Sequence, residues 1–110
     1  MAGFLGLLGL GQRAGSLIVG VDGVRSGLQR GRCRLVVVAR DASPRAVEKV
    51  VRLAQARGVP CLTGPAAALL GQQLGRPPVM AVGVRDPALA RGLTQAAPGE
   101  RRDGGMSGQD

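Results

Sequence analysis

The sequence has no histidine, tyrosine or tryptophan, and it has only one lysine and one phenylalanine. Acid–base and nucleophilic catalysis depend on side chains that titrate near the working pH, and this chain offers few of them. We therefore expect no enzymatic activity. RNA-binding modules that stack bases on Phe, Tyr or Trp side chains are excluded as well, because the rings are missing.

Cysteine is also scarce. Cys33 and Cys61 have no C-x-x-C spacing and no histidine to join them, so we expect no metal site. Each lies beside a predicted strand, where a free thiol packs like a small apolar residue, and free thiols fit a reducing cytoplasm. No phosphate-binding G-x-x-x-x-G-K-[ST] motif occurs. Gly9, Gly11 and Gly15 do not form a dinucleotide-binding loop, because such a loop follows a strand and none is predicted before them. We therefore expect no cofactor.

Acidic residues are few relative to basic ones, at 7 against 15, which leaves a formal charge of +8. This excess of positive charge favours an anionic binding partner, and it favours nucleic acid over a membrane surface. The apolar run over residues 1–10 lacks the positive n-region of a signal peptide and is too short to cross a bilayer. We therefore expect neither secretion nor a membrane partner.

The length suits one domain with an aliphatic core. Residues 94–110 are polar and glycine-rich without periodicity, so we expect a folded domain over residues 1–93 and a disordered tail over residues 94–110. The tail holds two basic and three acidic residues. The folded domain therefore keeps thirteen basic and four acidic residues, a charge of about +9.

Short apolar runs alternate with amphipathic stretches through the folded domain, and turn signals separate them. Asp22 is a predicted N-cap, and Ser43-Pro44 and Asp86-Pro87 are predicted to open later helices. Gly31, Gly58 and Gly75 are each predicted to end a helix. Helices are predicted over about 4–14, 22–30, 44–57, 66–74 and 87–93, and strands over about 17–19, 35–39, 60–63 and 79–84. This alternation predicts an α/β sandwich with helices on both faces of a central sheet.

Residues 16–44 form a predicted strand–helix–strand unit around which the chain is organised. We expect the start of its helix and the end of its second strand to lie at one edge of the sheet. Several arginines are expected to share that edge and to form one cationic surface for RNA, namely Arg25, Arg30, Arg32, Arg34, Arg40 and Arg76.

Four phrases, in order, carry a resemblance to a known family: LGLGQRAGSLIVG, RLVVVARDASP, GVPCLTG and LGQQLGRPP. Over about residues 5–93 the chain resembles the ribosomal L7Ae family of kink-turn RNA-binding proteins, and in particular its small bacterial YlxQ-type branch. The resemblance implies a three-layer α/β/α sandwich with a small central mixed sheet and alternating helices. That fold agrees with the pattern described above.

The resemblance also implies an RNA site at the start of the helix after the first strand. There the family carries a Gly-x-Asn-Glu-x-x-Lys pattern that reads sheared G·A pairs and their phosphates. In this chain Gly20 matches the glycine, and Val21 follows it. Asp22 stands at the Asn position and keeps an oxygen acceptor, whereas Gly23 replaces the Glu and Ser26 replaces the Lys.

Nearby arginines are candidates to replace the missing lysine. Arg25 lies one residue before the lysine position, about 100° away around the helix, and Arg30 matches a basic position one turn further on. Arg40 replaces an acidic residue of the family at the end of the second strand. The family's second RNA contact is an apolar loop before the last strand, which corresponds here to Arg76, Pro77 and Pro78.

These features predict a non-enzymatic, monomeric protein that binds structured RNA, either ribosomal or kink-turn-like. We expect it to act in a cytoplasmic ribonucleoprotein, with ribosomal proteins as further partners. Affinity would be largely electrostatic and would fall with salt. Because Asp22, Gly23 and Ser26 depart from the family pattern, a second hypothesis is a protein-interaction or scaffold module that has lost specific RNA recognition. A third, the substrate-binding part of an RNA-modifying enzyme, would need a catalytic domain fused to this one.

Overall fold

The structure is a computed structural model that describes residues 3–97. Within them, helices and strands alternate as α1 (Phe4–Arg13), β1 (Leu17–Val19), α2 (Val21–Gln29), β2 (Leu35–Ala39), α3 (Pro44–Ala56), β3 (Cys61–Gly64), α4 (Ala67–Leu74), β4 (Ala81–Val84) and α5 (Pro87–Ala96). The strands form one mixed sheet in the order β1-β4-β2-β3. In it β2 and β3 are parallel, and β4 is antiparallel to both β1 and β2.

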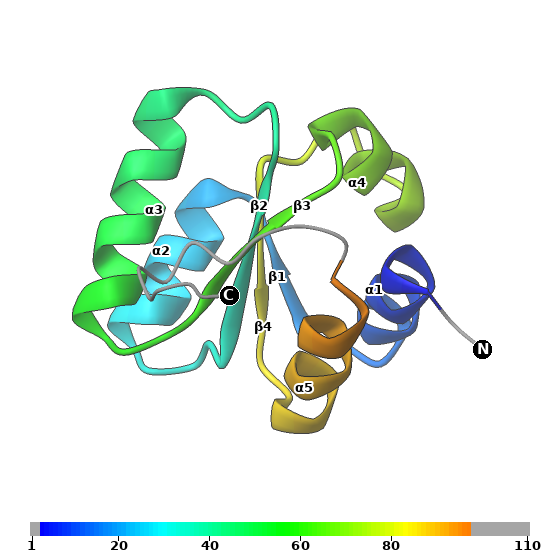
Figure 1. Ribbon diagram of the computed structural model, residues 1–110, viewed down its shortest axis with the longest axis horizontal. Coiled ribbons are helices and arrows are strands. Elements are labelled where there is room, and N and C mark those ends of the chain that lie inside the picture. The colour runs from blue at the N-terminus through cyan, green and yellow to red at the C-terminus, as the bar shows by residue number, and fades with distance from the viewer. Residues whose placement is uncertain (1–2, 98–110) are drawn as a thin grey trace, which may run out of the picture.

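Helices cover both faces of the sheet, which confirms the predicted three-layer α/β/α sandwich (Figure 1). The central strand β2 is buried along its whole length and divides its side chains between the two faces. Val36 and Val38 pack under α2 and α3, whereas Leu35, Val37 and Ala39 belong to the core formed with α1, α4 and α5. The strand's period of two explains why this run of five residues is entirely apolar.

The sheet has two distinct ends that we name for the rest of the description. At the carboxyl edge β1, β2 and β3 finish and β4 begins, and at the amino edge β1, β2 and β3 begin and β4 finishes. In Figure 1 the carboxyl edge is at the top and the amino edge at the bottom. Helices α2 and α3 therefore run from the carboxyl edge to the amino edge, whereas α4 links the end of β3 to the start of β4, both at the carboxyl edge.

Local signals placed most element boundaries correctly. The hydroxyl of Ser43 accepts a hydrogen bond from the Ala46 N–H at 3.2 Å, and the Asp86 carboxylate accepts one from the Leu89 N–H at 2.9 Å. Both residues are N-caps followed by proline, as predicted. Gly58 and Gly75 end their helices with φ of 69° each, a conformation that disfavours other residues.

Three boundary predictions were wrong. Asp22 is not an N-cap, because α2 begins at Val21 after Gly20, and Asp22 lies within the first turn. Strand β4 begins at Ala81 and not at Val79, because the Val79 N–H bonds to the Ala67 carbonyl in α4 at 3.0 Å. Helix α5 continues to Ala96, three residues beyond the predicted end. The rest of the predicted tail, residues 98–110, lies outside the described residues.

Both cysteines are buried thiols. Among residues 3–97, no helix is long and apolar enough to cross a membrane, and no three His, Cys, Asp or Glu side chains are grouped so that they could hold a metal ion.

Candidate nucleic-acid interface

Four chain segments that lie far apart in the sequence meet at the carboxyl edge. They are the start of α2, the exit of β2, the exit of β3 and the loop that precedes β4. Backbone hydrogen bonds connect them: the Gly20 N–H bonds to the Ala81 carbonyl, the Ala39 N–H to the Met80 carbonyl, both at 2.9 Å, and the Arg40 N–H to the Pro65 carbonyl at 3.3 Å. The edge is therefore a continuous surface held by the sheet and not a set of independent loops.

The start of α2 is open to a ligand. Gly20 is the N-cap, and no side-chain hydrogen bond caps the helix. The N–H groups of a first helical turn have no partner inside the helix, and they carry the positive end of the helix dipole. Asp22 adds an exposed carboxylate in the same turn. The turn thus offers backbone donors and one anionic acceptor side by side, which suits base edges as well as phosphates.

Gly20 has a backbone conformation that only glycine adopts readily, with φ of 100° and ψ of 154°. We expect Gly20→Ala to lower the free energy of unfolding by about 1–3 kcal/mol, measured by urea denaturation. Gly31→Asn is the control, because Gly31 has φ of 70° and asparagine tolerates that left-handed region. A Gly20→Ala protein as stable as the wild type would contradict this explanation of the sharp entry into α2.

The residues that follow on α2 are less accessible than the sequence suggested. Gly23 is half-buried, and a Cβ there would lie 3.0 Å from a methyl group of Ile18 on β1. Gly23 therefore has a packing role. Arg25 and Ser26, two of the predicted RNA-binding residues, are half-buried in the second turn.

Asp41 holds the exit of β2 against the start of α4. Its Oδ1 accepts a hydrogen bond at 2.8 Å from the N–H of Ala67, the first residue of α4. The N-cap position of α4 is Ala66, which has no side chain able to cap. Asp41 therefore caps α4 from 26 residues away, and it fixes the backbone on which Arg40 is displayed.

We expect Asp41→Ala to lower the free energy of unfolding by about 1 kcal/mol, the usual cost of losing a helix cap. Asp41→Asn keeps an oxygen acceptor and should retain most of this stability. Thermal or urea unfolding of the two variants measures the difference. Equal losses in both would show that the charge of Asp41, and not its hydrogen bond, stabilises this edge.

The loop before β4 presents Arg76, Pro77 and Pro78, all exposed, next to the buried anchor Val79. Gly71 of α4 lies directly beneath the loop. A Cβ on Gly71 would overlap the carbonyl oxygen of Pro77 and would lie 2.7 Å from that of Arg76. The missing side chain at residue 71 therefore lets the loop pack against α4 and sets its position.

The structure brings together most of the predicted site residues but separates others. Gly20, Val21, Asp22 and Gly23 share the carboxyl edge with Arg40 and the loop of residues 76–78. The prediction of one cationic surface was wrong, because Arg30, Arg32 and Arg34 follow α2 and lie at the amino edge. A helix of nine residues is about 13 Å long, so residues at its two ends cannot share an edge.

The carboxyl edge is consequently less positive than expected. Its basic residues are Arg40, Arg76 and also Arg45, at the second position of α3, and its acidic residues are Asp22 and Asp41. The sum is about +1. Sequence reasoning missed Asp41 and Gly71 as positioning residues, because neither contact is visible in the local pattern around those residues.

A model of one protein family matches residues 4–93, which is almost all of the described chain. The chain belongs to the ribosomal protein L7Ae/L30e/S12e/Gadd45 family. Membership of the L7Ae family confirms the resemblance carried by the four sequence phrases. It also accounts for the sandwich and for the order of its elements.

This chain is similar to two individual proteins. It is 32% identical over 87 residues to the RNA-binding protein YlxQ of Bacillus subtilis (strain 168), an alignment that covers 79% of this chain and 87% of YlxQ. It also resembles a solved structure described as a protein with unknown function from Bacillus halodurans C. For that structure the TM-score is 0.82 and the identity 28%, with 87% of this chain and 97% of the other covered.

Proposed function

We propose that this protein binds structured RNA through the carboxyl edge, with a kink-turn as the preferred form, and that it acts in association with the ribosome. The observation that carries the proposal is the convergence there of the uncapped start of α2, the exposed Arg40 and the loop of residues 76–78. Membership of a family of ribosomal proteins and similarity to an RNA-binding protein support it.

Each part of the edge has a distinct task in the proposed complex. The free N–H groups at the start of α2 and the guanidinium groups of Arg40 and Arg76 meet phosphate oxygens. Asp22 accepts hydrogen bonds from base amino groups, as carboxylates do when they read nucleic acids. Pro77 and Pro78 offer a rigid apolar surface beside an unstacked nucleotide, since proline has a fixed φ. Arg25 and Ser26, which are half-buried, have at most a supporting role.

The proposed role is non-enzymatic. The described residues contain no histidine, and both thiols are buried. Burial raises the pKa of the Cys33 thiol, although the positive charge of Arg85 opposes the shift. Because the thiolate is the nucleophilic form, Cys33 is held in its unreactive state at neutral pH, and its role is to pack.

A second candidate function is a protein-interaction module with the same fold. The nearly balanced charge of the carboxyl edge favours it, because Asp22 and Asp41 offset most of the charge of Arg40, Arg45 and Arg76. Gly23 and Ser26 also stand where the family pattern has a glutamate and a lysine. This module would retain a protein partner after nuclease treatment and would have no measurable RNA affinity at moderate salt.

The two functions are separated by titrating a labelled kink-turn RNA and a plain RNA duplex of the same length at about 0.05 M and about 0.2 M salt. We expect tighter binding of the kink-turn, with an affinity that falls about 40-fold over this range if three phosphates are contacted. Equal affinity for both RNAs would reject kink-turn preference. No binding of either, together with a nuclease-resistant partner, would favour the interaction module. Crosslinking in cells and sequencing of the attached RNA would test the association with the ribosome.

A further inference from the structure

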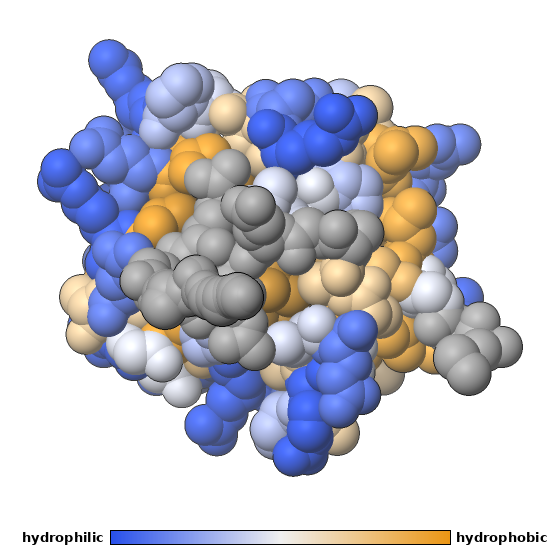
Figure 2. All heavy atoms as spheres, viewed as in Figure 1, coloured by the Kyte–Doolittle hydropathy of each residue, from blue (hydrophilic) through white to orange (hydrophobic). Residues whose placement is uncertain are grey.

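Within residues 3–97, the strongest concentration of positive charge lies at the amino edge, opposite the proposed kink-turn site. Six exposed arginines lie there: Arg13, Arg30, Arg32, Arg34, Arg57 and Arg85. The acidic residue described at this edge is Asp86, and its carboxylate is engaged in capping α5. The amino edge therefore carries about +5, against about +1 at the carboxyl edge. Figure 2 shows strongly hydrophilic side chains projecting from the lower margin of the molecule, where Figure 1 places this edge.

The sheet arranges this charge in a row. Arg13 closely precedes β1, Arg85 follows β4 directly, Arg34 directly precedes β2, and Arg57 lies shortly before β3. In the strand order β1-β4-β2-β3, an arginine directly adjoins the ends of β4 and β2, whereas Arg13 and Arg57 lie four residues before β1 and β3. Neighbouring strands are about 4.8 Å apart, so the row extends over about 14 Å. Successive phosphates of one nucleic acid strand are about 3.4 Å apart along the helix axis, so a row of this length spans about four phosphate steps.

Structural roles account for only part of the cluster. Arg57 donates a hydrogen bond from Nη1 to the Gln29 carbonyl at 3.0 Å, and Arg85 donates one to the Gly15 carbonyl at 3.4 Å. Arg30 occupies the C-cap of α2, where a cation offsets the helix dipole. Within residues 3–97, the side chains of Arg13, Arg32 and Arg34 have no hydrogen bond or ion pair. Their mutual repulsion is a cost to the free protein that an anionic partner would relieve.

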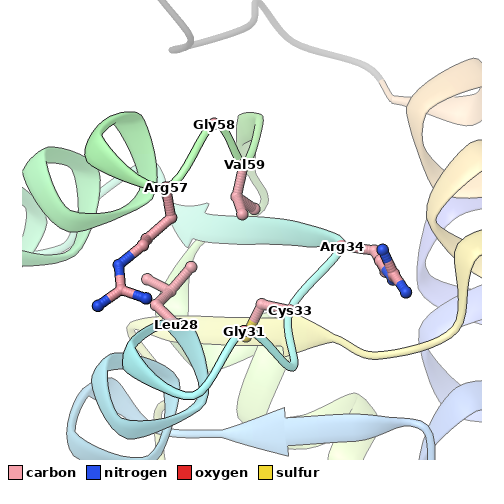
Figure 3. Close-up of a pocket in the computed structure, with 7 residues that line it drawn as sticks. All are labelled: Leu28, Gly31, Cys33, Arg34, Arg57, Gly58 and Val59. Carbon is pink, nitrogen blue, oxygen red and sulfur yellow. The ribbon is translucent and has the colours of Figure 1, made fainter.

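The hollow at this edge does not gather the arginine side chains around one point. The hollow has a volume of about 390 Å³ and is lined by apolar Leu28 and Val59, with Cys33 and the two arginines Arg34 and Arg57 at its margin. In Figure 3 the side chain of Arg57 lies over the end of α2, whereas that of Arg34 points away from the hollow in the other direction. The guanidinium groups do not converge on one point, so they suit separate phosphates along a polymer.

We propose that the amino edge is a second RNA-binding surface, which holds the phosphate backbone of a helical RNA segment without reading its sequence. This inference rests on the proposed function in that its ligand is also RNA. It adds that one molecule contacts two RNA segments at once, because the two edges lie on opposite ends of the sheet. The protein then links a kink-turn to a neighbouring duplex.

Three variants with equal changes in net charge test the proposal. The amino-edge variant carries Arg13→Gln, Arg32→Gln and Arg34→Gln, which removes only arginines without a partner. The carboxyl-edge variant carries Arg40→Gln, Arg45→Gln and Arg76→Gln. The control carries Lys49→Gln, Arg52→Gln and Arg91→Gln, which are exposed on α3 and α5 away from both edges. Circular dichroism should first establish that each variant is folded.

The affinity of each variant for a plain RNA duplex and for a kink-turn RNA is measured over a range of salt concentrations. For the duplex, the amino-edge variant should bind at least about 50-fold more weakly at about 0.1 M salt, and the slope of log K against log salt should fall by about 2 to 3. The carboxyl-edge variant and the control should keep wild-type duplex affinity to within about a factor of three. Immobilised kink-turn RNA that is saturated with wild-type protein should capture labelled duplex. The same RNA saturated with the amino-edge variant should not capture it.

Each contrary outcome identifies which proposal has failed. If the amino-edge variant binds duplex as tightly as the control variant does, or if wild-type protein binds the kink-turn but no duplex, the second surface is rejected and the proposed kink-turn site stands. If duplex binding depends on the amino edge but the kink-turn is not preferred, the second surface stands and the carboxyl-edge proposal is rejected. An acidic protein partner at the amino edge would leave duplex affinity unchanged, which also rejects the second surface.

Discussion

Reversing the charge of Arg40 and Arg76 together should weaken the binding of a kink-turn RNA by about 100-fold at about 0.1 M salt. Both side chains are exposed at the carboxyl edge, and within the described residues neither has a hydrogen bond or ion pair from its side chain. Each is expected to neutralise one phosphate, and a contact of this kind contributes roughly tenfold at this salt concentration. Because no buried group is changed, the free energy of unfolding should change by less than about 0.5 kcal/mol.

The matched control for this prediction is the pair Lys49→Glu and Arg91→Glu, which alters the net charge by the same amount. Lys49 lies on α3 and Arg91 on α5, in different layers and away from the ends of the sheet. The control should lose only a few-fold in affinity, through the general field of the protein. Fluorescence anisotropy with a labelled kink-turn gives both affinities. Equal losses in the two double variants would mean that overall charge, and not the carboxyl edge, determines RNA binding.

The second large effect is expected from Gly71→Ala, which should lower the free energy of unfolding by about 3 kcal/mol. The new methyl group would overlap the Pro77 carbonyl oxygen, and the neighbouring Arg76 carbonyl oxygen lies only 2.7 Å away. Both obstacles are backbone atoms, so a rotamer change cannot remove them. Either α4 or the loop must move, and the loop carries Arg76 and the two prolines of the proposed RNA contact.

Gly92→Ala provides the control in another helix. A Cβ at residue 92 would lie 3.7 Å from a methyl group of Leu7, an ordinary contact. Since alanine favours helix over glycine by about 1 kcal/mol, this change in α5 should be neutral or stabilising. Urea denaturation of the two variants should therefore give changes of opposite sign or of clearly different size. If Gly71→Ala is also neutral, α4 does not determine the position of the loop.

For Gly71→Ala, RNA affinity should fall together with stability, because the loop is displaced even in molecules that remain folded. Kink-turn affinity is measured at a temperature at which the variant is fully folded by circular dichroism. Asp41→Ala acts on the same edge through a weaker contact and should show a smaller loss of both properties. A folded Gly71→Ala protein with wild-type affinity would remove the loop of residues 76–78 from the RNA site.

Features that depend on residues close together in the chain were predicted correctly. Ser43 and Asp86 cap helices within three residues of themselves, and Gly31, Gly58 and Gly75 lie just after helix ends. The apolar run of β2 identified a strand buried on both faces. Such signals act locally, so the sequence around each residue contains all the information that they need.

The prediction of one cationic surface failed for a topological reason. Asp22 and Arg30 lie near opposite ends of the same helix, and the pattern alone did not indicate at which edge of the sheet each end would lie. In a strand–helix–strand unit with parallel strands, the helix starts at one edge and must return the chain to the other. Arg30, Arg32 and Arg34 therefore lie opposite Asp22, and this followed only once the structure showed that β1 and β2 run in the same direction.

By itself, the sequence determined the class of fold, the family and the absence of histidine-based chemistry. These follow from composition, from periodicity and from phrases that span a few residues each. Only the tertiary structure decided which charged groups share a surface, that Asp41 caps α4, and that Gly71 positions the loop. These depend on the antiparallel pairing of β4 with β1 and β2 and on contacts between distant segments. Such contacts exist only once the chain has folded, because no local interaction encodes the direction in which two remote strands pair.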